Sequence, residues 1–323
     1  MRLKLRITAM VVMLFLLAAV PAFSNPASEV RLGVLKGPTG IGASHLLSLN
    51  DAGTSHNRYS VTVLAEATDM IAQIAAGQLD IAAIPTNAAA SLYNKTNGDV
   101  RLVALNTAGV LYILENGDTV KSVSDLKGKT ICAVGQGSNP EYVLRYILAG
   151  NGLDPDKDVD IVFMDSAELT TRAASGSIEV CMLPVPAVTT VLIKNPDMHI
   201  ALDMTDEWDA LGTGSMLTMG CVVVREDFLK EHPAEVRFFL EEYGKSIAWV
   251  KENVAEAGEL CAEYGIVPSA AVAKKAIPDC NLIFVSGDDI RAALEGYLQV
   301  LFDSNPKAVG GTMPGDDFYT LDI

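Results

Sequence analysis

Apolar and polar positions along this chain follow a pattern that occurs twice. Residues 77–90 read G-Q-L-D-I-A-A-I-P-T-N-A-A-A, and from Gly176 the chain reads G-S-I-E-V-C-M-L-P-V-P-A-V-T. The glycine, the acid, the proline and the apolar run between them recur at a constant spacing of 99 residues. Upstream, residues 30–35 match 129–134 at the same spacing, which becomes 98 after Asp99. The repeat predicts two units of shared architecture.

Each unit is predicted to contain three short strands separated by helices, in the order β-α-β-α-β. The strands are short apolar runs, and the segments between them open on Gly, Ser, Thr, Asp or Pro, which favour turns and helix starts. Continuously apolar strands are typical of parallel sheets that are covered on both faces. We expect strands at 30–35, 60–65 and 81–84 in the first unit, and at 130–134, 160–163 and 180–183 in the second.

The chain is predicted to cross between the two units twice, which makes the first unit discontinuous. The turn Asn116-Gly117-Asp118 is the expected first crossing, and the flexible segment Leu211–Ser215 is the expected second crossing. A strand at 219–225 then rejoins the first unit, and the remainder is expected to be helical. The predicted division is lobe one at 29–115 plus 214–323, and lobe two at 116–213.

The first 24 residues have the composition of an export signal. Arg2, Lys4 and Arg6 precede an uncharged apolar run at 7–20, and Ala22-Phe23-Ser24 provides a small-x-small cleavage site. No later run is long enough for a membrane span, and no cysteine follows the apolar run to carry a lipid anchor. We therefore expect a soluble periplasmic monomer after removal of residues 1–24, with no membrane insertion.

The charge balance is acidic and excludes nucleic acid as an expected partner. The full chain carries 24 basic and 40 acidic residues, for a net charge of −16. Removing residues 1–24 takes away three basic residues and no acid, which leaves a net charge of −19. An acidic surface of this size repels a phosphate backbone, and its simplest role is solubility.

Glycine-rich turns follow the first strand of each unit and lead into helices. The turns at 36–44 and 135–140 allow the backbone to approach a ligand, and helix N-termini present free N–H groups. Ligands of open α/β sheets bind at the carboxyl ends of the strands. The ligand-binding residues predicted on this basis are Lys36, Thr39, Gly40, Ser44, Thr86, Asn87, Gln136, Ser138, Asn139 and Val185.

Motifs of catalysis and of metal binding are missing from the sequence. The four histidines are scattered, and no nucleophile–base motif, Walker loop or zinc spacing occurs. We therefore predict no enzyme activity, no cofactor and no metal. Cys132, Cys181 and Cys221 lie in apolar runs and are expected to be buried thiols. Cys261 and Cys280 leave one optional disulfide open.

Several of these segments resemble one family. They are Gly-x-(Leu/Ile)-(Asp/Glu) before a strand, Ser124-Asp-Leu-Lys-Gly-Lys129, and Val223-Val-Arg-Glu-Asp-Phe-Leu with His232-Pro233. Together they resemble the solute-binding proteins of ABC importers of the nitrate/sulfonate/taurine type, also called thiamine-pyrimidine-synthesis-like. The resemblance implies a type II periplasmic-binding fold that closes on a small molecule and delivers it to a permease and its ATPase.

Two other functions share this fold and stay open at this point. One is an exported receptor that feeds a membrane sensor instead of an importer. The other is an enzyme of the related menaquinone or thiamine-pyrimidine type. The export signal argues against the cytoplasmic menaquinone enzymes, and the Cys-rich active segment of the pyrimidine synthases is missing.

The predicted ligand is neutral or cationic. Among the segments expected at the strand ends, Lys36 is the only base, whereas Glu66, Asp69, Glu141, Asp165 and Glu168 are acids. A site for sulfonate or nitrate would ordinarily include an Arg or Lys, and a rim of acids would repel an anion. The alternative is that these acids cap helices and face water.

Overall fold

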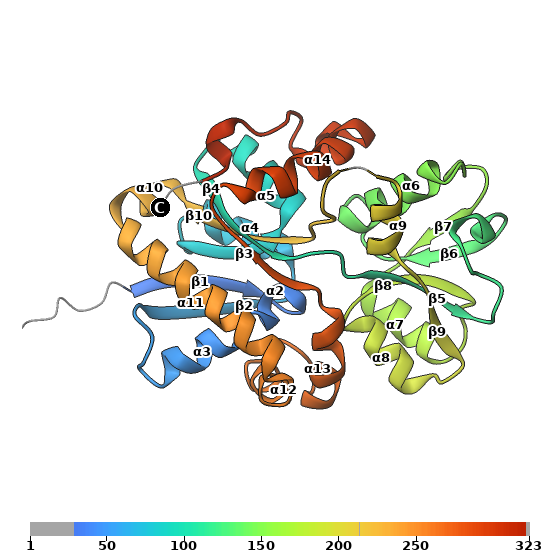
Figure 1. Ribbon diagram of the computed structural model, residues 1–323, viewed down its shortest axis with the longest axis horizontal. Helices are drawn as coiled ribbons and strands as arrows, with labels where there is room; N and C mark the ends of the chain where they lie inside the picture. Colours follow the sequence, from blue (N-terminus) through green and yellow to red (C-terminus); the bar gives the residue numbers. More distant parts are fainter. Residues whose placement is uncertain (1–28, 213, 321–323) are drawn as a thin grey trace, which may run out of the picture.

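Two mixed β-sheets, each with helices on both faces, form the two lobes of the protein (Figure 1). The computed structural model describes residues 29–212 and 214–320. The predicted export signal at 1–24 lies outside the described residues. This two-lobed α/β architecture is the one that the sequence predicted.

The two sheets have the same strand order, which confirms the sequence repeat. Four of the five matched strands are parallel, and the fourth in each order is antiparallel to its neighbours. Lobe one has the order β2 (Arg58–Leu64), β1 (Glu29–Leu35), β3 (Ile81–Pro85), β10 (Gly220–Arg225), β4 (Val100–Thr107) and β11 (Leu282–Val285). Lobe two has the order β7 (Asp160–Phe163), β6 (Thr130–Ala133), β8 (Val180–Pro184), β5 (Leu111–Asn116) and β9 (Met198–Asp203).

The helices cover the sheets in two layers that run through both lobes. One layer contains α2 (Pro38–Ile41), α3 (Ser44–Asp51), α11 (Pro233–Glu252), α12 (Val254–Glu263), α13 (Ala270–Ala276), α7 (Ser166–Ala174) and α8 (Ala187–Lys194). The other contains α4 (Ala67–Ala75), α5 (Thr86–Lys95), α14 (Asp289–Ser304), α6 (Asn139–Gly150) and α9 (Met204–Ala210). Shorter elements are η1 (Val123–Leu126), α10 (Glu226–Glu231), η2 (Ile277–Asp279), η3 (Pro306–Val309) and η4 (Asp316–Phe318).

Successive residues of each strand point to opposite faces of the sheet and so belong to two different hydrophobic cores. Val34 and Leu183 belong to the core under α3, α7, α8 and α11, whereas Leu35 and Met182 belong to the core under α4, α5, α6 and α14. Strands that are apolar on both faces therefore have helices on both faces, as parallel strands require. No helix among the described residues has the length and apolarity that a membrane span needs.

The first crossing lies earlier than the sequence predicted. β5 pairs with β8 and β9, so it belongs to the sheet of lobe two, although the predicted boundary after residue 115 placed it with lobe one. The chain crosses at residues 108–110, between β4 and β5. Asn116-Gly117-Asp118 instead forms the turn at the far end of β5. Apolar residues in β5 suit either sheet, and only the backbone pairing distinguishes the two.

Two further differences from the sequence prediction lie in the C-terminal part. Leu282–Val285 forms the edge strand β11, antiparallel to β4, where a helical remainder was expected. The run is short, and its pairing partner lies about 180 residues earlier in the chain. Cys261 and Cys280 are both buried free thiols, like the other three cysteines, so the optional disulfide is not formed.

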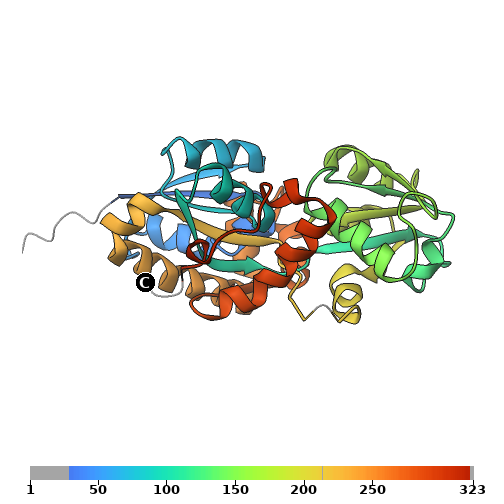
Figure 2. The ribbon, with the colours of Figure 1, turned by 90° about the horizontal axis from the view of Figure 1, so that it is seen from above.

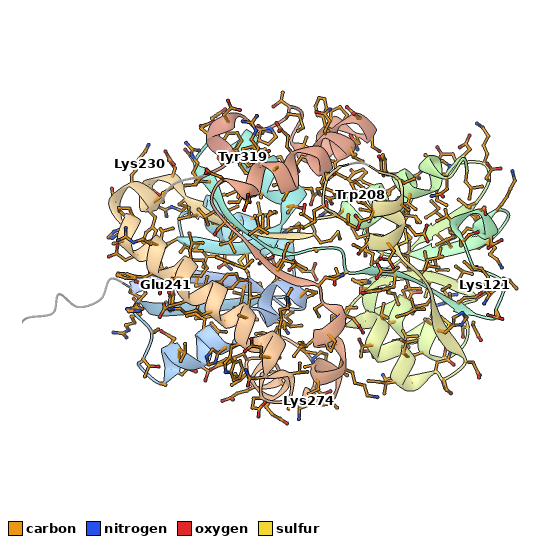
Figure 3. All side chains as sticks on the ribbon, in the orientation of Figure 1. Lys121, Trp208, Lys230, Glu241, Lys274 and Tyr319 are labelled. Atoms are coloured by element: carbon orange, nitrogen blue, oxygen red, sulfur yellow. The ribbon has the colours of Figure 1, made fainter. Side chains whose placement is uncertain are left out.

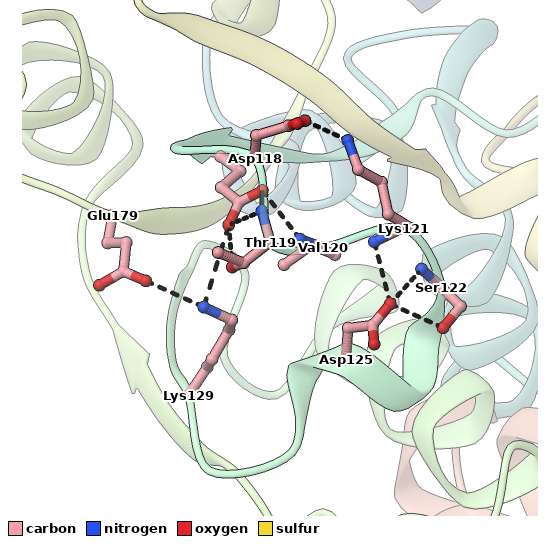
Figure 4. A network of polar contacts seen from close by, with 9 residues as sticks. Asp118, Thr119, Val120, Lys121, Ser122, Asp125, Lys129 and Glu179 are labelled. Carbon is pink, nitrogen blue, oxygen red and sulfur yellow. Dashed lines mark hydrogen bonds and ion pairs between the residues drawn. The ribbon is translucent and has the colours of Figure 1, made fainter.

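The Asp-Leu-Lys-Gly-Lys segment stabilises the start of lobe two (Figure 4). Asp125 and Ser122 form a capping box on η1. Lys129 Nζ lies 2.9 Å from Glu179 Oε1 and 3.9 Å from Glu115 Oε1. Glu115 is fully buried and accepts hydrogen bonds from the backbone N–H groups of Thr119 and Val120. The motif is therefore structural in this chain.

Candidate ligand-binding site

The loops after β1 and β8 bring the two lobes together. A β-carbon placed on Gly37 would lie 3.8 Å from Pro186 Cδ, and the φ angle of Gly37 is +91°. Gly37 N donates to Ile266 O at 3.1 Å, which fixes this loop in lobe one. Because parallel strands of one sheet end at the same edge, the ends of β3 and β6 lie at this junction as well.

Of the four predicted residues in the first loop, two maintain the backbone conformation of the loop. A β-carbon on Gly40 would lie 2.2 Å from Leu35 O, so only glycine fits there. Ser44 is fully buried and donates to Ile41 O at 2.9 Å. Lys36 is exposed and Thr39 is half-buried. Lys36 and Thr39 are therefore the side chains of this loop that a ligand could reach.

The N-terminus of α5 carries the next two predicted residues. Thr86 is fully buried, and its hydroxyl donates to Thr218 O at 2.7 Å. Asn87 Nδ2 makes a long contact of 3.5 Å with Ala308 O. Pro85 at the N-cap position offers no side-chain hydrogen bond to the first turn of α5. The N–H groups of that turn consequently have no side-chain cap among the described residues.

At the α6 N-terminus in lobe two, the side chain of Asn139 is buried and has no hydrogen-bond partner among the described residues. Its side chain is 3% exposed, and neither Nδ2 nor Oδ1 has a hydrogen-bond partner within the described part of the chain. A buried unpaired amide costs about 1–3 kcal/mol. Ser138 Oγ donates to Gly135 O at 2.7 Å, and Gln136 is exposed. The α6 N-terminus therefore has a buried amide that is free to bind a ligand.

Val185, the last predicted residue, supports the site from below and does not line it. It is 1% exposed, and its N–H donates to Val110 O at 3.0 Å. This bond ties the end of β8 to the first crossing segment. The peptide bond between Val185 and Pro186 is cis. The side chain of Val185 is thus an apolar anchor beneath the loop that faces Gly37.

Sequence reasoning missed the polar residues that the C-terminal part contributes. Thr218 Oγ1 and Tyr297 Oη are buried and have no hydrogen-bond partner among the described residues. Asn305 Nδ2 donates to Tyr142 Oη at 3.1 Å, which joins lobe one to lobe two. Burial raises the pKa of Tyr297. Tyr297 was not identifiable because it follows the apolar spacing of α14, which ordinarily marks a core residue.

Three of the five acids expected at the strand ends have partners in their own helices. Glu141 accepts from Arg145 Nε and from Gly137 N, both at 2.7 Å. Asp165 caps α7 by accepting from Ala167 N at 2.8 Å. Glu168 lies 3.4 Å from Arg172 Nη1. These acids therefore have the capping and pairing roles that the sequence left open as an alternative.

The thiols and the acids offer little catalytic chemistry. Burial raises the pKa of Cys181 to about 12 and that of Cys261 to about 11, so both thiols are protonated at neutral pH. Among residues 29–212 and 214–320, no group of three or more His, Cys, Asp or Glu side chains is placed to hold a metal ion. The arrangement at the lobe junction is suited to binding through hydrogen bonds.

A cavity of about 470 Å³ lies beside the crossing segments. Its lining includes Ala108 of the first crossing, Met216 of the second and Asn281 before β11. Asn281 holds the first crossing by two hydrogen bonds: its carbonyl accepts from Ala108 N at 3.0 Å, and its Nδ2 donates to Gly109 O at 2.6 Å. The segment before β11 thus fixes the first crossing segment to lobe one.

Comparison with known proteins identifies similar sequences and folds. The family described as NMT1/THI5 like matches residues 59–257. A putative aliphatic sulfonates-binding protein from Bacillus subtilis is 27% identical over 157 residues, which cover 48% of this chain and 43% of that protein. The chain spans about two-fifths of the length of the curated relatives that it matches.

Solved structures match over most of the chain. A protein described as an ABC transporter from Parabacteroides distasonis is 24% identical with a TM-score of 0.75, covering 92% of this chain and 99% of its own. The periplasmic aliphatic sulphonate binding protein SsuA from Escherichia coli is 17% identical with a TM-score of 0.71, covering 90% and 95%. These similarities show that the fold is that of the periplasmic solute-binding proteins.

Proposed function

Since this chain belongs to the NMT1/THI5-like family, we propose that it captures a small molecule between its two lobes and delivers it to an ABC importer. The observation that carries the proposal is the buried and unpartnered amide of Asn139 at the N-terminus of α6. The α5 N-terminus lies at the end of β3, and the α6 N-terminus with Asn139 follows β6. Helix N-termini and unpaired buried amides both favour bound polar groups.

Lobe closure follows from the way the lobes are joined. Among the described residues, short segments cross between the sheets at residues 108–110 and between α9 and β10, and hinge motions use such segments. Lobe one also contacts lobe two through α14 on α6 and through α13 on α8. Contacts on both sides of the junction are the arrangement expected of a closed state. Opening would separate these helices and admit the ligand.

The proposed ligand is a neutral or cationic small molecule. Lys36, Thr39, Thr86, Asn87, Gln136, Ser138 and Asn139 are the residues proposed to contact it, whereas Gly40, Ser44 and Val185 hold the backbone beneath them. The Bacillus subtilis relative is described as binding aliphatic sulfonates, which makes a sulfonate the principal alternative. In the proposed contact set, the one charged side chain is the exposed Lys36.

A thermal-shift screen tests the function. The panel contains nitrate, taurine, alkyl sulfonates, amino acids, pyrimidines and vitamins. A solute present at about 100 times its dissociation constant adds about 2.7 kcal/mol of stability. Small-angle scattering with the best solute should then report a monomer that becomes more compact. A panel without any stabilising member, together with unchanged scattering, would count against solute binding.

The proposed location is the periplasm, with an ABC permease and its ATPase as partners. The support is the basic start, the apolar run at 7–20 and the cleavage site after Ser24. N-terminal sequencing of the exported protein should begin at or near Asn25. A product that retains Met1 in the cytoplasm would contradict this location.

A further inference from the structure

Three hydroxyl groups gather at the N-terminus of α5, where lobe one meets lobe two. They belong to Thr86 of α5, Thr218 of the second crossing segment and Tyr297 of α14, and all three side chains are fully buried. Thr86 Oγ1 donates to Thr218 O at 2.7 Å, and α5, which Thr86 opens, packs against α14, the helix that carries Tyr297. We call these three residues the inner polar subsite.

Two of the three hydroxyls make no hydrogen bond with the described residues. Thr218 Oγ1 and Tyr297 Oη have no hydrogen-bond partner within the described residues. Other buried tyrosines use theirs: Tyr59 Oη donates to Glu242 Oε2 at 2.8 Å, and Tyr243 Oη donates to Thr39 O at 3.2 Å. An unpaired buried hydroxyl costs about 1–3 kcal/mol, so each of the two needs a partner that the described residues do not supply.

The subsite lies at the joint between the lobes. The ring of Tyr297 is 5.5 Å from that of Trp208, which is 4.9 Å from that of Tyr146 on α6. Trp208 lies on α9 (Figure 3). A β-carbon on Gly296, next to Tyr297, would lie 2.7 Å from Ser215 Cβ in the second crossing segment. In the view from above, α14 lies beside the junction of the two lobes (Figure 2). Separation of the lobes would therefore uncover Tyr297.

The groups of the subsite favour a hydrogen-bond acceptor. The two free hydroxyls can donate. In the first turn of α5, Thr86 N makes a 3.4 Å contact with Met219 O, and the N-cap residue Pro85 offers no side-chain acceptor to the other N–H groups. The three side chains of the subsite, those of Thr86, Thr218 and Tyr297, carry no cationic group. Burying an anion without a cation beside it costs several kcal/mol. An uncharged acceptor carries no such cost.

We propose that the inner polar subsite binds an uncharged oxygen acceptor of the solute, such as a carbonyl oxygen, through Thr218 and Tyr297. The inference rests on the proposed solute-binding function and goes beyond it by assigning the chemical class of one ligand group. It also adds two ligand-binding residues, from the crossing segment and from the C-terminal helix, to those at the strand ends.

The first test needs no ligand. Protein refolded from denaturant is free of bound solute, and its urea midpoint is compared among wild type, Tyr297→Phe, Thr218→Val and the control Tyr59→Phe. Removal of an unpaired hydroxyl should leave the midpoint unchanged or raise it, whereas Tyr59→Phe should lower it because that hydroxyl is bonded to Glu242. A midpoint for Tyr297→Phe as low as that of Tyr59→Phe would assign a structural bond to the hydroxyl and overturn the proposal.

The second test uses acetamide, acetate and methylammonium, three probes with one methyl group each that differ in charge. Saturation-transfer NMR on wild type should detect acetamide more strongly than acetate or methylammonium. The acetamide signal should fall in Tyr297→Phe and Thr218→Val and persist in Tyr59→Phe. A stronger acetate signal, an absent acetamide signal, or one that both subsite variants retain would each overturn the assignment.

Different results would refute the subsite and the solute-binding function. A panel solute that stabilises wild type and Tyr297→Phe equally would refute the subsite while the solute-binding function stands. A panel without any binder would count against the function, and the stability and probe measurements would still decide whether the subsite exists.

Discussion

Asn305 and Tyr142 form a hydrogen bond between the lobes. Asn305 Nδ2, before η3 in lobe one, donates to Tyr142 Oη of α6 in lobe two at 3.1 Å, and Tyr142 Oη donates to Gly137 O at 3.3 Å. Asn305 Oδ1 accepts from Lys307 N, which holds the asparagine in place. The turn that precedes α6 is thereby linked to the C-terminal segment of the chain, and the link exists only when the lobes are together.

The Tyr142→Phe variant should weaken binding of the solute that the panel identifies. It removes the hydroxyl but keeps the ring, so the closed state loses about 1 kcal/mol and the dissociation constant rises about three- to tenfold. Calorimetry measures the change. Tyr264→Phe is the control, since Tyr264 Oη donates to Asp51 within lobe one. Equal effects of the two variants would contradict a role in closure.

The Asp80→Asn variant should be destabilised by about 2 kcal/mol, because Asp80 is 2% exposed and accepts from Arg31 N and Nε, both at 2.9 Å. Glu179 occupies the equivalent position in the repeat but is exposed, so Glu179→Gln should cost less than about 1 kcal/mol. Urea unfolding of both variants gives the comparison. Equal losses would mean that burial does not distinguish the two acids.

Glu115 should contribute to stability at neutral pH and lose that contribution on acidification. Burial acts to raise the pKa of Glu115, but hydrogen bonds from Thr119 and Val120, with Lys129 nearby, lower it below its ordinary value of 4.5. The folded state therefore binds this proton less readily than the unfolded chain, and the contribution is lost as pH falls below about 4.5 through the folded pKa.

Urea unfolding at several pH values, from neutral to strongly acid, measures this contribution. The Glu115→Gln variant should be less stable than wild type at neutral pH, and the difference should shrink as the pH falls. Glu168→Gln, which changes an exposed carboxylate, is the control and should leave the acid dependence close to that of wild type. A constant difference between Glu115→Gln and wild type across the range would refute the assignment.

Asn139→Leu should lose solute binding without losing stability. The amide is buried and unpartnered, so an apolar side chain of similar size leaves the ligand-free protein as stable as wild type or more so, while binding weakens by tenfold or more. Asn195→Leu is the control in the same lobe. Asn195 Nδ2 donates to Ala173 O at 3.0 Å, and this variant should be destabilised. If Asn139→Leu binds the solute as tightly as wild type does, Asn139 is not part of the binding site.

The repeat allowed much of the fold to be predicted from sequence. β3 and β8 begin at positions 81 and 180, and β4 and β9 begin at 100 and 198, which reproduces the spacings of 99 and 98 read from the sequence. Apolar runs, turn glycines and helix starts are local properties, so they are visible without a structure. The same local signals located Thr86 and Asn139 at helix N-termini beside strand ends.

The sequence by itself determined the two β-α-β lobes, the strands that repeat between them and the helix starts that follow those strands, because each depends on neighbours in the chain. Only the tertiary structure decided which sheet receives β5, that residues 282–285 form an edge strand, and which polar groups meet at the junction. The bond from Thr86 to Thr218 joins residues 132 positions apart, and the bond from Asn305 to Tyr142 joins residues 163 positions apart. Such partners are chosen by packing across the whole fold, and no local pattern of residues records that choice.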